Sequence, residues 1–382
     1  MSANYWTSTQ RKYWTFTPEK LAEKRHELEK TYSKIYEQYP YPDRRHLLIF
    51  IRDRILQLAK RLPFRQQCVA TALVYLQRYF LFYPVQNLNL YLILATAFYL
   101  SSKTEESPHH IRLVAAEARQ SWPEFVPGDV SRLGEMEFCL ISEMRSQLIV
   151  WHPYRSLLDM KENQDIKLTP DELGLAWSII NDSFMTDLPL TCPPHLTAVI
   201  AMFLAVIFLP SAKASGALRP LTHDTIANPE SGPFSSFGGG RPAMSGPFNN
   251  LLTSLHMSGQ QNGSQSSANH SNPNMMGQAP SRFSHQHSLS QSSTQSQPQT
   301  SAGNTSVPTT GLSEREKTIQ AIKESERMQS LMKFLVESDL DIPRMIEGTQ
   351  EMISLYDCWE QYNEKAVKDI VGRCLKARGL DS

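Results

Sequence analysis

Three features that mark other protein classes are missing from this 382-residue sequence. Lysine and arginine number 38 and so do aspartate and glutamate, so the basic excess typical of a nucleic-acid-binding protein is absent. The five cysteines include no C-x-x-C pair, and the N-terminus lacks the pattern of a secretory signal. Both observations predict a reducing intracellular compartment. The longest apolar run, residues 196–209, is interrupted by Thr197 and is too short to span a bilayer, so we expect a buried helix there.

Motifs that carry catalysis are also missing. The sequence has no glycine-rich phosphate loop, no G-x-S-x-G turn and no H-E-x-x-H helix. The eleven histidines place no pair of metal ligands on one helical face. Glu105 and Glu106 are adjacent carboxylates, but no nucleophile accompanies them. We therefore expect no catalytic residue, no metal and no cofactor, and a chain that is not an enzyme.

The balanced total charge hides an uneven distribution. Residues 1–82 hold 15 basic and 7 acidic side chains, whereas residues 83–210 hold 8 basic and 15 acidic ones. Such an arrangement favours protein surfaces of opposite sign over a phosphate-binding face. Ordinary solvation of helix faces explains it equally well.

One segment differs in composition from the rest. From residue 211 to residue 312 charged residues nearly vanish and Ser, Gln, Asn and Gly dominate. A segment of this kind buries too little apolar surface to offset the entropy of ordering it, so we expect a disordered insertion. A passive role is favoured over activator-like contacts. Order is expected to return at Ser313, which with Glu316 forms a capping box that opens a helix.

Elsewhere the apolar spacing is helical, with no sustained alternation of the strand kind. The predicted fold class is therefore all-α, in two similar helical sets, the second of which begins after the connecting string 148–155. In the second set Thr169, Pro170 and Glu172 mark a helix start. The expected helices of the first set are 45–62, 65–82, 90–103, a short one after Pro108, and 129–144. Those of the second are 171–185, 194–209, 317–337, 342–363 and 366–377.

Several strings resemble the cyclin family. Residues 65–80 (RQQCVATALVYLQRYF) are similar to the second helix of a cyclin box, and residues 97–106 (AFYLSSKTEE) to the end of its third helix, with Ser101 in place of an alanine. Met136-Glu137 is similar to the M-E motif of the fifth helix. The strings at 4–8 (NYWTS), 151–155 (WHPYR) and 175–188 (LAWSIINDSFMTDL) resemble the cyclin C subfamily, in a fungal type with a long insertion.

This resemblance implies the cyclin fold, with two tandem five-helix boxes and an N-terminal helix. It divides the chain into an N-terminal kinase-contacting segment (1–44), a first box (45–147), the first part of a second box (148–210), the insertion (211–312), and the rest of the second box with a tail (313–382). The insertion would lie between the second and third helices of the second box, an unusual place. The first helix of the second box would be 171–185.

The function implied by the resemblance is regulatory. Such a subunit binds and activates a cyclin-dependent kinase of the Mediator complex in the nucleus, together with other subunits of the kinase module. The kinase phosphorylates the C-terminal repeat domain of RNA polymerase II and transcription factors, mostly as a repressor and sometimes as an activator. A cyclin-fold general transcription factor that contacts promoter DNA stays open as an alternative, although the charge balance and the lack of a zinc ribbon argue against it. No membrane partner is expected.

The resemblance also implies which residues bind the kinase. Lys103 and Glu137 match the contact pair of the family, and a lysine at a helix C-terminus complements the helix dipole and can donate to backbone carbonyls of a partner. Glu105 and Glu106 suggest a carboxylate that substitutes for an activation-loop phosphate by pairing with arginines. A solvated acidic pair is the alternative.

Two further groups are candidate contacts. Trp6 and Trp14 lie in an aromatic N-terminal segment that either anchors a partner or folds back on the chain's own box. Trp177 and Asn181 are neighbours on one helical face. That face, with Asp182 and the connecting residues Trp151, Tyr154 and Arg155, either buries an interface between the boxes, which we favour, or lines a groove for a partner peptide.

Overall fold

The computed structural model describes residues 4–161, 166–214 and 314–380, and it describes no side chains for residues 210–214 and 314–325. The predicted insertion (211–312) and the capping box at Ser313 therefore fall mostly or wholly outside the described residues. Within the described ranges all regular elements are helical, which confirms the all-α fold class. None of the helices in these ranges is long and apolar enough to cross a membrane.

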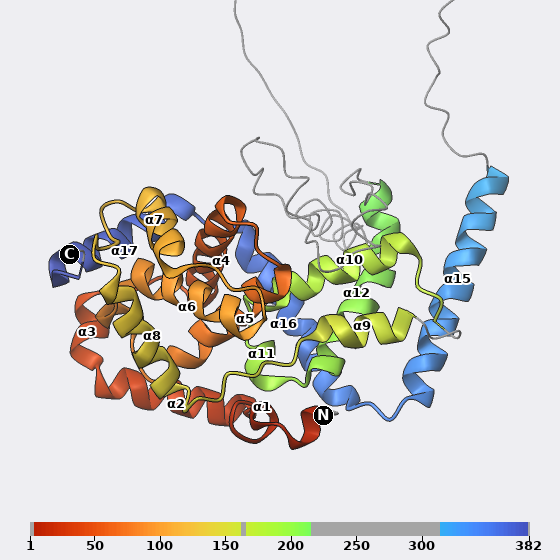
Figure 1. Ribbon diagram of the computed structural model, residues 1–382. Helices are drawn as coiled ribbons and strands as arrows, with labels where there is room; N and C mark the ends of the chain where they lie inside the picture. The colour runs from red at the N-terminus through yellow and green to blue at the C-terminus, as the bar shows by residue number, and fades with distance from the viewer. Residues whose placement is uncertain (1–3, 162–165, 215–313, 381–382) are drawn as a thin grey trace, which may run out of the picture.

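Five helices form the first box (Figure 1). They are α4 (Arg44–Arg61), α5 (Gln66–Tyr79), α6 (Leu90–Thr104), α7 (Ile111–Ser121) and α8 (Ser131–Glu143). Helix α6 contacts the other four helices that surround it, and it is buried on most of its circumference, as its nearly continuous apolar sequence predicts. The Asn89 side chain caps it by accepting from the Leu92 N–H. These helix positions match the prediction to within a few residues.

The second box differs from the prediction at both ends. It begins with an additional helix, and the last helix expected for it, 366–377, contacts the first box instead. The helices of the second box are α9 (Pro153–Lys161), α10 (Pro170–Ser183), the short α11 (Leu188–Thr191), α12 (Pro194–Ala214), α15 (Glu314–Glu337) and α16 (Ile342–Glu360). Helix α9 occupies the string that we expected to be only a connection, so α10 is the second helix of this box and not the first. When the short α11 is not counted, α12 is the third helix of this box. The stretch 215–313 therefore follows the third helix, whereas the resemblance implied that the insertion follows the second.

The C-terminus returns to the first box. Helix α17 (Glu364–Arg378) contacts α4 and the short helix η2 (Val85–Asn87). Arg54 of α4 pairs with Glu364, and the Arg378 guanidinium donates to Asn87 Oδ1 at 2.8 Å. In Figure 1 this helix lies at the opposite end of the molecule from α15.

The N-terminal segment lies along the lower side of Figure 1, across both boxes. It contains η1 (Tyr5–Thr7), α1 (Thr9–Tyr13), α2 (Pro18–Thr31) and α3 (Ser33–Gln38). Arg25 of α2 makes two hydrogen bonds of 2.7 Å with the carboxylate of Asp187, which follows α10, and Arg44 pairs with the same carboxylate. The Phe16 N–H donates to the Leu190 carbonyl at 2.8 Å.

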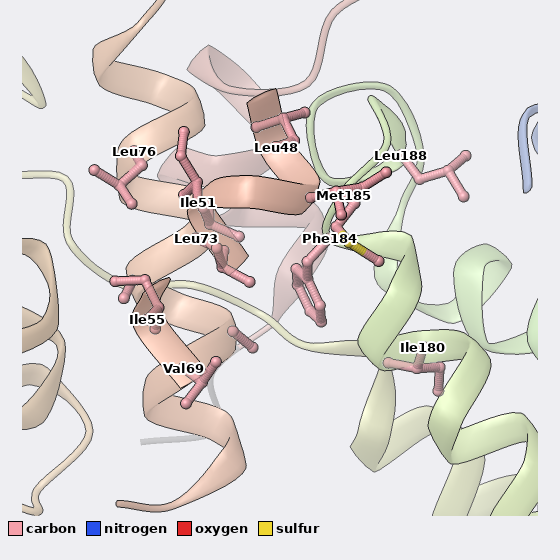
Figure 2. Close-up of a cluster of buried hydrophobic side chains, with 14 of the residues drawn as sticks. Leu48, Ile51, Ile55, Val69, Leu73, Leu76, Ile180, Phe184, Met185 and Leu188 are labelled. Carbon is pink, nitrogen blue, oxygen red and sulfur yellow. The ribbon is translucent and has the colours of Figure 1, made fainter. Parts of the chain in front are cut away.

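The two boxes share one continuous hydrophobic core. Figure 2 shows side chains of α4 and α5, among them Ile51 and Leu73, facing Ile180, Phe184 and Met185 at the end of α10. The Gln77 side-chain amide donates to the Phe184 carbonyl at this junction. Because apolar side chains from both boxes fill the same core, the boxes are held in one arrangement by packing as well as by polar contacts.

Candidate partner-binding surface

Lys103 and Glu137 lie together at the end of α6. The Lys103 ammonium pairs with Glu137 Oε1 and lies 4.7 Å from the centroid of the Tyr99 ring. Lys103 is exposed, whereas the Glu137 carboxylate is mostly covered. The geometry therefore holds the lysine at the C-terminus of the helix, where it faces solvent and has donor N–H groups to offer.

Glu105 and Glu106 are adjacent in sequence but differ in environment. Glu105 accepts hydrogen bonds from Thr71 (2.5 Å) and Gln67 (2.7 Å), and the His152 ring nitrogen Nε2 lies 3.7 Å from it. Its carboxylate is thus used within the chain. Glu106 is exposed and has a left-handed backbone conformation, with φ of 51°, which turns the chain away from the end of α6.

The two N-terminal tryptophans also differ. Trp6 is 57% exposed and packs on one side against His195, with 5.4 Å between ring centroids. Trp14 is only 3% exposed. Its indole N–H donates to Gln147 Oε1 at 2.8 Å, and its ring contacts Phe82 edge-on. Trp14 is therefore a core residue, and we correct the expectation that its side chain faces a partner.

Two exposed apolar residues were not predicted as contacts. Phe138 on α8 is 79% exposed. Ile149 is 72% exposed and lies in the linker between the boxes, residues 144–152, which joins α8 to α9. Phe138 directly follows Glu137, the residue that pairs with Lys103. The only signal in the sequence was position, because Leu133 and Leu140 form the buried stripe of α8 and Phe138 is not on that stripe.

Specific hydrogen bonds connect the linker to the end of α6 and the N-terminal segment to the linker. The Tyr75 hydroxyl donates to the Leu148 carbonyl at 2.6 Å and lies 3.0 Å from Thr104 Oγ1, so the linker passes beside the end of α6. The N-terminal segment pairs with the linker through Trp14 and Gln10. We name the resulting surface the contact edge and define it by its exposed members: Trp6, Tyr13, Lys103, Glu106, Phe138 and Ile149.

The face around Trp177 lies where the two boxes meet. Tyr154 is buried and donates to Asn181 Oδ1 at 2.7 Å, and its ring centroid lies 4.6 Å from that of Trp177. Arg52 of the first box bonds the Asp182 carboxylate at 3.2 Å. The Arg52–Asp182 contact joins the two boxes, whereas the Tyr154 contacts with Trp177 and Asn181 join α9 to α10 within the second box. Trp177 and Asn181 remain partly exposed, Arg155 is exposed, and Trp151 is partly buried.

Asp182 is the buried acid of this interface. Burial raises its pKa to about 6, while the Arg52 guanidinium and the Tyr356 hydroxyl, which lies 3.3 Å from Oδ2, act in the opposite direction. Across the described ranges, no group of three or more His, Cys, Asp or Glu side chains is placed to hold a metal ion. Of the five cysteines only Cys139, next to Phe138, is exposed.

Comparison with known proteins places the chain among fungal relatives of the same length. The profile "Cyclin, N-terminal domain" matches residues 19–124. The RNA polymerase II holoenzyme cyclin-like subunit of Aspergillus oryzae is 40% identical over 381 residues, and that of Aspergillus terreus 39% over 385 residues, each match covering 100% of both chains. That of Gibberella moniliformis is 38% identical over 381 residues, again covering both chains fully.

A solved structure gives a more distant match. A chain of the CAK complex from Chaetomium thermophilum bound to ATP-gamma-S is 20% identical, with a TM-score of 0.45, over 56% of this chain and 71% of that one. The relatives matched over their full length carry the assignment. The chain belongs to the cyclin family, among the RNA polymerase II holoenzyme cyclin-like subunits.

Proposed function

We propose that this chain is the regulatory subunit of a Mediator-associated cyclin-dependent kinase, and that it acts in the nucleus. The kinase that it activates phosphorylates the C-terminal repeat domain of RNA polymerase II and so regulates transcription. The catalytic step belongs to the kinase. The proposal is supported by the name shared by the full-length relatives and by the contact edge, which consists of exposed apolar and charged side chains.

The contact edge has the composition of a protein interface. Phe138 and Ile149 supply apolar anchors, and aromatic anchors at the centre of an interface typically dominate its free energy. Lys103 supplies ammonium donors for the backbone carbonyls of a kinase helix. Trp6 and Tyr13 extend the edge onto the N-terminal segment, residues 1–44, which we assign to kinase contact together with the first box.

Glu106 has a separate role in this proposal. Its carboxylate is exposed and can pair with arginines of the kinase activation loop, as a phosphate would. Glu105 does not share this role, because its oxygens accept hydrogen bonds from Thr71 and Gln67 within the chain.

The direct test is a pull-down from nuclear extract with the full chain as bait, followed by mass spectrometry. We expect one cyclin-dependent kinase and large Mediator subunits in stoichiometric amounts. Recovery of general transcription factors and promoter DNA without a kinase would reject the proposal.

A variant tests the contact edge itself. Phe138→Ala should reduce the recovery of the kinase at least about tenfold, since central aromatic anchors contribute about 2 kcal/mol or more. Val336→Ala is the matched control, because Val336 is 80% exposed but lies on α15 in the second box. Equal recovery with the two variants would show that Phe138 is outside the interface.

A further inference from the structure

Two glutamines join the N-terminal segment to the linker between the boxes, and each contacts a tryptophan of the other segment. The Gln10 side chain is buried, and its Oε1 accepts from the Trp151 backbone N–H at 2.6 Å while its Nε2 lies 3.5 Å from the Trp151 carbonyl. In return, Gln147 Oε1 accepts from the Trp14 indole N–H at 2.8 Å. Residue 10 faces residue 151 and residue 14 faces residue 147, so the two segments run antiparallel. We name these four residues the glutamine clasp.

Arg78 of α5 anchors the clasp to the first box. Its side chain is fully buried, its Nη1 donates to the Gln147 carbonyl at 3.0 Å, and its guanidinium lies 4.9 Å from the Trp14 ring centroid. Arg78 therefore contacts the clasp in both segments, through Gln147 of the linker and Trp14 of the N-terminal segment. Burial lowers the pKa of Arg78 to about 10, so the guanidinium remains charged at neutral pH and keeps its attraction for the Trp14 ring.

The linker enters the clasp in a strained conformation. Arg145 and Ser146, directly before Gln147, have φ values of 52° and 57°, in the left-handed region that residues with a Cβ rarely adopt. Backbone strain of this kind persists only where surrounding contacts determine the path of the chain. The clasp supplies such contacts immediately after the strained pair.

The exposed side chains of the contact edge depend on this arrangement. Ile149 lies between the two clasp residues of the linker, and Tyr13 lies between those of the N-terminal segment and next to Trp14. Helix α1 has five residues, and a helix of that length has no stability of its own in water. Without the clasp, Trp6 and Tyr13 would have to be ordered at the moment of binding, and that ordering weakens affinity.

We propose that Gln10, Trp14 and Gln147 are positioning residues that preorganise the contact edge before the kinase binds. Gln10 and Gln147 set the register of the N-terminal segment on the linker. Arg78 fixes both segments to the first box through its contacts with Gln147 and Trp14. The inference rests on the proposed function, because it names the contacts that make one part of the kinase-binding surface rigid.

The test uses the full chain with Gln10→Met, which keeps the length of the side chain and removes both contacts with Trp151. Gln38→Met is the matched control, because Gln38 is exposed on α3. Hydrogen exchange of the Trp151 amide, measured without the kinase, should accelerate at least about tenfold in Gln10→Met only. The dissociation constant for the kinase recovered in the pull-down should rise about 5- to 30-fold.

Trp14→Phe is the second variant. It keeps an aromatic ring over Arg78 but removes the N–H that donates to Gln147. If Gln10→Met loses helical content, Trp14→Phe is used in its place. It should also speed exchange in residues 147–151 and weaken kinase binding. Unchanged hydrogen exchange of residues 147–151 in a folded variant would show that the clasp does not hold the linker and would reject the inference.

The inference and the proposed function fail in different ways. If exchange accelerates but kinase affinity equals that of Gln38→Met, the clasp does not preorganise the interface, while a loss of binding in Phe138→Ala still supports the proposed function. If neither Gln10→Met nor Phe138→Ala weakens kinase binding, the contact edge is not the kinase surface and the inference is rejected, whereas the proposed function is rejected only if the pull-down recovers no kinase.

Discussion

At the scale of single residues, Glu105 and Glu106 separate a structural from a functional carboxylate. Glu105 accepts from Thr71 and Gln67, so Glu105→Gln should lower the free energy of unfolding by about 1–3 kcal/mol. Glu106 is exposed, so Glu106→Gln should leave stability unchanged but lower the activity of the reconstituted kinase more than its binding. Thermal denaturation measures the stability of the two variants, and kinase assays measure the activity with Glu106→Gln. Full activity of Glu106→Gln would reject the phosphate-like role.

Asp182 gives a prediction about pH. Burial raises its pKa to about 6 in the folded chain, above the ordinary aspartate value of 3.8, so the folded state binds the proton more tightly than the unfolded state between these values. Its contribution to stability is therefore fully present below about pH 4 and is lost as pH rises through about 6.

Chemical denaturation of the wild type and Asp182→Asn at pH 4, 5, 6 and 7 measures this contribution. The stability of the wild type relative to the variant should fall by about 1–3 kcal/mol from pH 4 to pH 7. A difference that stays constant with pH would show that Asp182 has an ordinary pKa despite its burial.

Sequence reasoning reached some of the candidate residues and not others, for a physical reason. The family pattern pointed to Lys103 and Glu137, and the structure shows them paired. Hydrophobicity alone does not reveal whether an aromatic side chain meets its own core or solvent. Trp14 was therefore kept as a candidate contact beside the alternative that it folds back on the chain, and it is buried, whereas Phe138 was not singled out although it is exposed.

At the scale of helices, local sequence signals predicted where a helix begins better than they predicted which box the helix belongs to. The capping box of Thr169 and Glu172 is present as expected and begins α10. Helix α9 was missed because it has only nine residues and begins at Pro153 inside a string that looks like a connection. That one omission shifted the numbering of the second box, although every other long helix was expected near its observed position.

The C-terminal end of α8 gives a prediction about backbone strain. Ser146 has φ of 57°, a conformation that costs a residue with a Cβ about 1–2 kcal/mol and glycine much less. Ser146→Gly should therefore raise the free energy of unfolding by about 0.5–1 kcal/mol. Ser142→Gly, an exposed site within α8, should lower it by a similar amount. Denaturation midpoints that move in the same direction would contradict this explanation.

At the scale of the whole molecule, both ends of the chain connect parts that are distant in sequence. Helix α17 returns to α4 of the first box, and the N-terminal segment bonds the linker through Gln10 and the second box through Arg25 and Asp187. These long-range pairings could not be predicted from sequence patterns, because hydrophobic periodicity shows which face of a helix is buried but not which element covers it.

The last prediction concerns removal of residues 1–16. A segment that only anchored a partner would add little to stability, but the structure buries Tyr5, Gln10 and Trp14 in this segment. Loss of a buried tryptophan alone typically costs about 3–5 kcal/mol. The truncated chain should therefore melt at a clearly lower temperature in calorimetry and also bind the kinase more weakly.

Trp6→Ala separates the two effects of that truncation. Trp6 is mostly exposed, so its removal should weaken kinase binding and leave the melting temperature nearly unchanged. A truncated chain that melts like the wild type would show that the N-terminal segment does not pack as the structure has it. If Trp6→Ala binds the kinase with full affinity, the segment stabilises the two boxes and contributes no contact of its own through Trp6.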